Sequence, residues 1–137
     1  LGHDIEASWL LYEAACVLGN KVLTANVKHE SIKIAKAALE GISLRGGLIN
    51  EMNYTTGHVD DNSDWWPQAE AIVGFLNAWQ LSNDKYYLQK VTDVWEFTKN
   101  NIIDSRHGEW FWSVNNKGKK NTENDKAGFW KCPYHNG

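Results

Sequence analysis

The feature that most constrains the fold is a repeat of helical segments within one short chain. Glu6-Ala7 recurs as Glu70-Ala71, and Ala14 recurs as Ala78 at the same interval. Each copy lies in an apolar pattern with helical spacing, which a second helical pattern and a short extended stretch then follow. Two such hairpins leave their inner helices without full cover. The sequence therefore predicts part of an all-α toroid whose hairpins pack on further neighbours.

Four helices are expected, over residues 4–18, 27–40, 67–81 and 84–103. Gly19-Asn20 supplies the stop signal of the first helix. Pro67 suits the first turn of the third helix, because the amide hydrogen that proline lacks has no partner there. Asn83-Asp84 supplies the N-cap signal of the fourth helix.

Two segments that follow the second helix of each half, residues 46–50 and 107–114, are predicted to be short extended or hairpin segments. Trp110 and Trp112 alternate in the second of them, so they point the same way and are expected to pack. Residues 115–126 are polar and rich in Lys, Asn and Gly. This composition predicts a surface loop.

Composition excludes several classes of function. At 137 residues, of which 42% are hydrophobic, the chain can form one domain with a core. The net charge is −3 and acids and bases are interspersed, which argues against a nucleic-acid partner. No apolar run approaches the ~20 residues that span a bilayer, so no membrane partner is expected.

Cysteine usage is sparse, since Cys16 and Cys132 form neither a CxxC motif nor a disulfide framework. Cys16 lies in an apolar helical run and is expected to be a reduced core residue. A cytoplasmic location fits this usage. Cys132 and His135 could suggest a metal site, but no second ligand pair has zinc-like spacing. No metal ion or other cofactor is therefore expected.

Eight tryptophans are more than a 15.6 kDa core needs, which suggests an aromatic-lined cleft. Sugars present flat C–H faces that stack on such side chains. Trp66 and Glu70 are one helical turn apart at the start of the third predicted helix, a pairing typical of sugar sites. For Trp65 we favour a core position.

His3 and Glu6 are also one helical turn apart, near the start of the first predicted helix. A carboxylate there can hold one ring nitrogen so that the other faces a substrate, as an acid/base histidine requires. The plainer interpretation is that Asp4 or Glu6 only complements the helix dipole.

His135 ends a Cys-Pro-Tyr-His segment in which Pro133 stiffens the backbone, and Trp130 lies shortly before it. The alternative for His135 is a loop histidine that packs on Tyr134. The remaining histidines lie in polar or turn contexts and are expected to be solvated: His29, His58 and His107.

Four long segments stand out, namely GHDIEASWLLYEAA (2–15), WWPQAEAIVGF (65–75), GEWFWSV (108–114) and KAGFWKCPYHNG (126–137). Together they resemble the cellobiose 2-epimerases of the N-acylglucosamine 2-epimerase superfamily, and the similarity covers the whole chain. Asp4 and the Cys-Pro-Tyr before His135 resemble the cellobiose branch more than the N-acylglucosamine 2-epimerases proper.

The resemblance implies an (α/α)6 barrel, of which residues 1–137 would be the C-terminal part. It implies metal-independent inversion at C2 of the reducing-end glucose of a cellobiose-type β-1,4 disaccharide. A further histidine and an arginine that the family uses would lie upstream. Part of a barrel on its own is expected to be inactive and to self-associate through the exposed faces of its inner helices.

The resemblance also assigns roles to residues. His3 and His135 match the acid/base pair, and Glu6 matches the carboxylate that orients the first histidine. The residues that match the lining of the sugar cleft are Trp9, Trp66, Glu70 and Trp130.

Other functions stay open from the residues. An aldose–ketose isomerase of the mannose/fructose type, or an N-acylglucosamine 2-epimerase, could use the same barrel. An (α/α)6 glycoside hydrolase would use a carboxylate pair such as Glu6 and Glu70. A non-catalytic sugar-binding module would keep Trp66 and Trp130 and need neither histidine.

Overall fold

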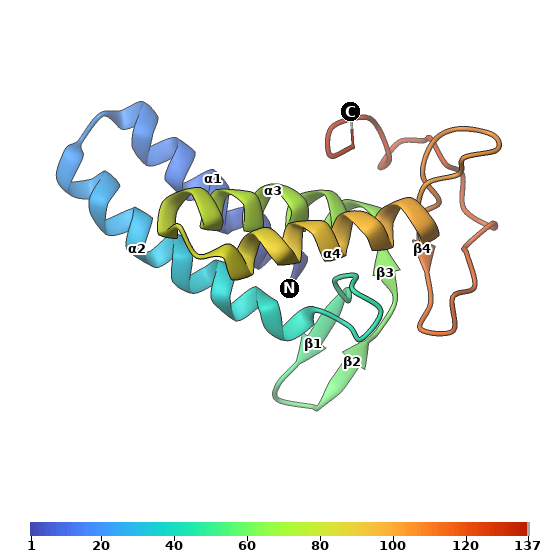
Figure 1. The fold of residues 1–137 in the computed structure, drawn as a ribbon. Coiled ribbons are helices and arrows are strands. Elements are labelled where there is room, and N and C mark those ends of the chain that lie inside the picture. The colour runs from blue at the N-terminus through green and yellow to red at the C-terminus, as the bar shows by residue number, and fades with distance from the viewer. Residues whose placement is uncertain (137) are drawn as a thin grey trace.

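The chain folds into two antiparallel helical hairpins, as the computed structural model of residues 1–136 shows (Figure 1). The helices are α1 (Gly2–Leu18), α2 (Lys21–Ala38), α3 (Trp65–Ser82) and α4 (Lys85–Asn101), with a 3-10 turn at Leu39–Gly41. Helix α1 packs on α2, α3 packs on α4, and α1 also packs on α3. The two inner helices, α1 and α3, therefore lie side by side, as the repeat predicts.

Both hairpins turn by the same local device, a left-handed residue followed by a capping side chain. Gly19 has φ 68° and ends α1, and the Asn20 side chain then accepts hydrogen bonds from the first amides of α2. Asn83 has φ 62° and ends α3, and Asp84 caps α4. The expected start of the second helix at residue 27 was wrong, because the Asn20 cap begins that helix at Lys21.

Two short antiparallel strand pairs form outside the helices. Strand β1 (Glu51–Asn53) pairs with β2 (His58–Asp60), with Glu51 opposite Asp60. Strand β3 (Ser63–Asp64) pairs with β4 (Ser113–Val114), which ties the start of α3 to the loop after α4. Of the extended segments that we expected, residues 107–114 form a strand only at the end, and residues 46–50 precede β1.

The main core lies where α1, α2, α3 and α4 meet. Its most buried members include Ile5, Phe75 and Val94. Gly74 lets α1 approach α3 closely, since a Cβ there would lie 2.7 Å from the backbone oxygen of Ile5. A second cluster surrounds Trp65, which is 4% exposed, so its predicted core position is confirmed.

The α1–α2 turn projects beyond the other hairpin (Figure 1), and several of its apolar side chains are exposed. Val17, Leu18 and Val22 are 87%, 71% and 72% exposed. Cys16 is exposed as well, so our prediction of a core cysteine was wrong. Helix α2 covers one side of that end of α1, where Ala15 is buried and its carbonyl accepts from Thr24, but Cys16 lies on the exposed side.

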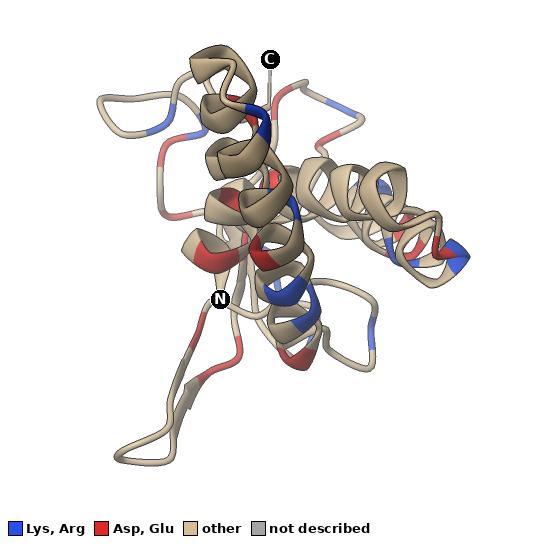
Figure 2. Ribbon diagram, turned by 90° about the vertical axis from the view of Figure 1, so that its left-hand side faces the viewer, with Lys and Arg blue, Asp and Glu red and all other residues tan. Residues whose placement is uncertain are grey.

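Charged residues of both signs are interspersed over the helices and loops (Figure 2). The acidic side chains are not gathered on one element, and neither are the basic ones. None of the helices within residues 1–136 combines the length and the apolar character needed to cross a bilayer.

Candidate active site

The first turns of α1 and α3 and the C-terminal loop (residues 126–136) meet around an open pocket of about 360 Å³. Aromatic and titratable side chains line it: His3, Glu6, Asp64, Trp65, Trp66, Trp112, Trp130, Tyr134 and His135. Segments from the start, the middle and the end of the chain thus contribute to one site. Of the seven site residues that the sequence indicates, five line this pocket. The other two are Glu70, which contacts His135, and Trp9, which contacts Glu70.

His135 is fixed by a buried carboxylate. Its Nδ1 lies 2.7 Å from Oε1 of Glu70, which is 4% exposed. The other oxygen of Glu70 accepts a hydrogen bond of 2.8 Å from the indole nitrogen of Trp9. Because a carboxylate only accepts hydrogen bonds, Nδ1 carries the hydrogen. Nε2 is then the ring nitrogen available for proton transfer.

His3 lies beside the indole ring of Trp66. Its ring centroid is 4.8 Å from that of Trp66, and the His135 centroid is 5.6 Å from the same ring. Trp66 therefore contacts both histidines at once. The backbone also contributes, because a Cβ on Gly2 would lie 2.5 Å from the Trp66 ring. Only glycine lets the start of α1 approach this tryptophan.

The predicted hydrogen bond between Glu6 and His3 is absent from residues 1–136, so this part of our interpretation was wrong. The His3 ring packs against the Trp66 ring instead, at an interplanar angle of 44°. Glu6 is half-buried and its carboxylate belongs to a group with Glu70 and His135, whose ligand atoms lie within 4.8 Å of one another. Such a group could hold a metal ion, but Glu70 and the Nδ1 of His135 already form hydrogen bonds. The absence of a metal stays a prediction.

Asp64 is a pocket residue that the sequence did not reveal. It is the N-cap of α3, yet its side chain caps no amide of that helix. Burial, together with the negative charge of Asp60, raises the pKa of Asp64 to about 6. An aspartate just before a helix normally indicates a cap, so this pattern gives no sign of a carboxyl that titrates near neutral pH.

The C-terminal loop supplies the outer wall of the pocket. Trp130 is 79% exposed and meets the Phe129 ring edge-on. Tyr134 packs edge-on against His135 with ring centroids 4.7 Å apart. His135 therefore packs on Tyr134, as the alternative interpretation expected, and also contacts Glu70. The other histidines are exposed, as expected: His29, His58 and His107.

Comparison with known proteins identifies the family. The profile of the N-acylglucosamine 2-epimerase (GlcNAc 2-epimerase) family matches residues 2–136. The chain belongs to this family. Cellobiose 2-epimerase from Bacteroides fragilis is 54% identical over 99% of the chain, and the enzyme of the same name from Dictyoglomus turgidum is 44% identical over 99%.

Solved structures agree with this assignment to the N-acylglucosamine 2-epimerase family. The crystal structure of a sugar epimerase from a ruminal bacterium has a TM-score of 0.92 and 39% identity over 98% of the chain. The fold prediction is thus confirmed, since the two hairpins match part of an (α/α)6-barrel epimerase. The chain spans about a third of the curated relatives, 35% and 34% of their lengths, and 34% of the solved structure.

Proposed function

We propose that this chain is about a third of a sugar 2-epimerase that inverts C2 at the reducing-end glucose of cellobiose-type β-1,4 disaccharides. The observation that carries the proposal is the pair of histidines, His3 and His135, that contact the same Trp66 ring in one pocket. The names of the 54% and 44% identical relatives support the substrate class. The histidines argue against a glycoside hydrolase, which would need only carboxylates.

The chemistry of C2 inversion requires two acid/base groups. The sugar ring opens, and the proton on C2, which is acidic next to the aldehyde, is removed to give a planar cis-enediolate. Returning a proton to the opposite face inverts C2. His3 and His135 approach the pocket from different elements, and each imidazole can take or give a proton near neutral pH. One histidine would act on each face.

The other residues of the site would orient these two bases and hold the sugar. Glu70 keeps the Nδ1–H tautomer of His135, and Trp9 in turn holds Glu70. Trp66 and the exposed Trp130 offer flat apolar walls for the C–H faces of the sugar. Glu6 lies close enough to Glu70 and His135 to contribute negative charge beside the imidazolium.

The decisive experiment is turnover of cellobiose in D2O by the full-length protein that carries this chain. The mechanism places one solvent deuterium at C2 of the glucosyl-mannose product, which NMR detects. A His29→Ala variant is the control, because His29 is exposed and lies outside the pocket. Product without deuterium at C2 would rule out the enediolate route.

The same experiment separates the main alternative. An aldose–ketose isomerase would pass through the same enediolate but return the proton to C1 and release a ketose. N-acetylglucosamine as the substrate tests the N-acylglucosamine 2-epimerase alternative. A cytoplasmic location belongs to the proposal too, and the exposed unpaired thiols of Cys16 and Cys132 support it.

A further inference from the structure

The C-terminal loop must be held in place by side chains. Residues 126–136 form no helix or strand, yet they carry both Trp130 and His135. The pocket therefore depends on a segment without a hydrogen-bonded ladder of its own. Such segments stay ordered only where specific contacts fix them to the body of the fold.

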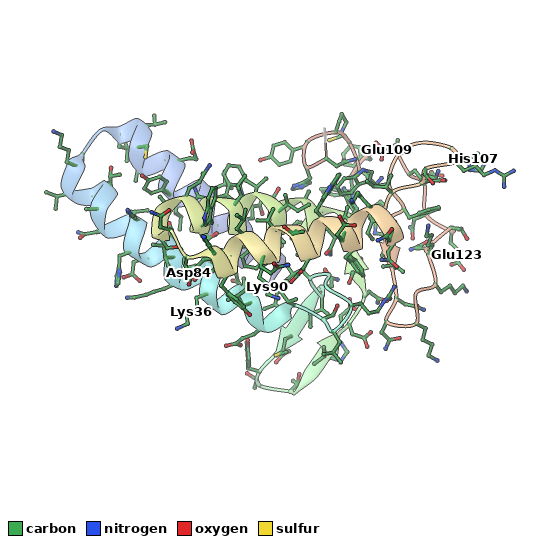
Figure 3. All side chains as sticks on the ribbon, viewed as in Figure 1. Lys36, Asp84, Lys90, His107, Glu109 and Glu123 are labelled. Carbon is green, nitrogen blue, oxygen red and sulfur yellow. The ribbon has the colours of Figure 1, made fainter. Side chains whose placement is uncertain are left out.

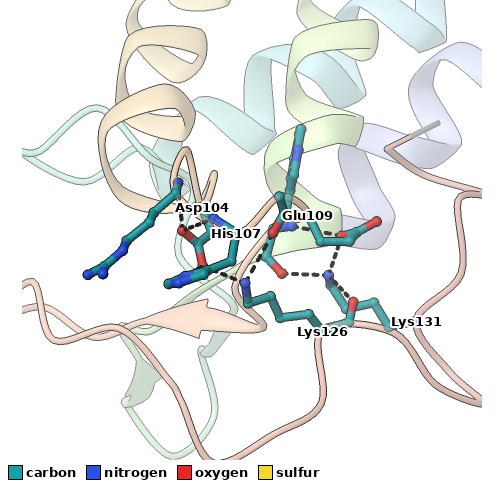
Figure 4. A network of polar contacts seen from close by, with 8 residues as sticks. Asp104, His107, Glu109, Lys126 and Lys131 are labelled. Atoms are coloured by element: carbon teal, nitrogen blue, oxygen red, sulfur yellow. Dashed lines mark hydrogen bonds and ion pairs between the residues drawn. The ribbon is translucent and has the colours of Figure 1, made fainter.

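Lys131 provides the most buried of these contacts, since the residue is 2% exposed. Its ammonium lies 2.9 Å from Oε2 of Glu109 (Figure 4). It also lies 2.6 Å from each of two carbonyl oxygens, those of Trp110 and Lys126. A buried ammonium is costly unless it is paired and fully hydrogen-bonded. These three acceptors meet that requirement.

The donor count of Lys131 indicates what kind of role it has. An ammonium has three hydrogens to donate, and all three have acceptors within the protein. No donor is left for a sugar oxygen. Lys131 also lies 5.5 Å from the centre of the Trp65 ring, which lines the pocket. Its contacts thus join the loop to the pocket wall without reaching the substrate.

Glu109 is held in an unusual backbone conformation at this same contact. Its φ is 63°, which is uncommon for a residue other than glycine. Burial would raise the pKa of Glu109, but hydrogen bonds from Lys131 and the Trp110 amide outweigh it and lower the pKa. The carboxylate therefore stays charged beside the ammonium.

A second lysine fixes the start of the loop. Lys126 pairs with Asp104 and also donates to the carbonyl of Gly108 at 3.1 Å (Figure 4). Its hydrogen bond holds the pKa of Asp104 well below the usual range. Lys126 is more open than Lys131, because 29% of its side chain is exposed against 1%. Of the two lysines, Lys131 thus makes the buried contact. Lys131 also lies between Trp130 and His135 in the chain.

We propose that the Lys131–Glu109 ion pair positions two residues of the active site. By fixing the C-terminal loop, it holds His135 against Glu70 and holds Trp130 at the rim of the pocket. This inference rests on the proposed epimerase function. Lys131 acts through other residues and is not itself a catalytic group. Losing it should displace the acid/base histidine, and small displacements of a reacting group cost a large part of the rate.

The test compares three variants of the full-length protein. Lys131→Met should lower kcat on cellobiose by about 10–100-fold with unchanged helical circular dichroism. Glu109→Gln keeps an acceptor oxygen and should lower kcat less. The control is Lys90→Met, which breaks a 2.8 Å ion pair with Asp93 on α4, far from Glu109 (Figure 3). It should leave kcat within about twofold, because such pairs contribute little.

A double variant separates positioning from a general loss of structure. In a His135→Ala background, Lys131→Met should lower the residual rate no further, because the group that it positions is already gone. A further fall of the same size would overturn the proposal. Unchanged kcat in Lys131→Met alone would overturn it as well.

An NMR measurement tests the positioning without any activity. In protein labelled with 15N-histidine, the Nδ1–H proton of His135 should give a downfield signal that His135→Ala removes. Lys131→Met and Glu109→Gln should weaken or abolish it, and Lys90→Met should not. If the wild-type protein had no epimerase activity, the proposed function would be overturned, but the NMR signal of His135 would still test whether Lys131 positions this histidine. An unchanged signal in Lys131→Met would overturn the positioning role.

Discussion

The Nδ1 atom of His135 lies 2.7 Å from Oε1 of Glu70, although the two residues are 65 positions apart in the chain. This contact joins the C-terminal loop to the first turns of α3. Glu70 comes from a regular helix, whereas His135 comes from a loop, so the helix sets the direction of the imidazole. The carboxylate also accepts from Trp9 on α1, and in this way three segments are fixed relative to one another.

Glu70→Gln should lower kcat of the full-length protein by roughly 10–100-fold. The carboxylate accepts from two donors, and an amide has only one acceptor oxygen. One of the two donors, from Trp9 or His135, must then face an NH2 group. Steady-state kinetics on cellobiose measure the loss. The control is Glu40→Gln, whose exposed carboxylate accepts a hydrogen bond from Tyr54 and lies outside the pocket. Equal kcat in both variants would mean that Glu70 does not orient His135.

His3→Ala and His135→Ala should each reduce turnover to a small residual rate and leave disaccharide binding largely intact. Their proposed work is proton transfer, whereas Trp66 and Trp130 supply the contact area for the sugar. General acid/base catalysis is worth roughly 10²–10⁴-fold. Rates from initial velocities and affinities from calorimetry separate the two effects. A variant that keeps more than about a tenth of the wild-type rate contradicts the role.

Much of the fold could be predicted from sequence, because its main signals are local. The capping residues Asn83-Asp84 and the repeat of Glu6-Ala7 as Glu70-Ala71 fix helices and their pairing. The β1–β2 hairpin could not be predicted, since its residues are mostly polar and lack alternating apolar positions. It is a connection whose turn depends on Asn53 capping the amides of Thr55 and Thr56.

The sequence indicates a set of candidate site residues but not the contacts among them. Spacing on one helix suggested that Glu6 would hold His3, whereas the observed partner of a histidine is Glu70, which lies on another element from His135. Such pairs depend on how helices and loops pack, which one-turn spacing does not encode. The sequence did not reveal the burial of Lys131 for the same reason, because burial of a lysine depends on tertiary contacts.

Asp64→Asn should stabilise the protein at pH 8 and have little effect at pH 4. The folded-state pKa of Asp64 is raised from 3.8 to about 6, so folding favours the protonated carboxyl over the charged one. As pH rises from about 4 through about 6, the carboxyl ionises in the folded protein and the free energy of unfolding falls. Partial exposure and the α3 dipole reduce the expected gain at pH 8 to about 1–2 kcal/mol.

Thermal melts of the full-length protein at both pH values measure this difference. Asp125→Asn provides the comparison, because Asp125 is exposed, and it should change Tm little at either pH. A gain for Asp64→Asn that was equal at pH 4 and pH 8 would show that the carboxyl is not the cause.

Gly74→Ala should destabilise the contact between α1 and α3. The new Cβ would lie 2.6 Å from Cγ1 and 2.7 Å from the backbone oxygen of Ile5. A backbone atom cannot rotate away, so the helices must separate, at a typical cost of about 1–3 kcal/mol. Better helix propensity offsets about 1 kcal/mol of this. Tm should fall, whereas Gly128→Ala, where a Cβ meets nothing within 4 Å, should leave Tm unchanged.

The 137-residue chain by itself should self-associate and lack epimerase activity. Apolar side chains are exposed along α1 and the start of α2, including Leu11, Val17 and Val22, and apolar patches beyond a few hundred Å² are rare on monomers. Sedimentation should show oligomers that Leu11→Glu with Val17→Glu reduces, because charges at these positions oppose burial. The matched pair Thr55→Glu with Thr56→Glu, on the β1–β2 turn, should not reduce them. A monodisperse monomer that melts cooperatively would contradict our expectation that these helix faces pack on neighbouring hairpins.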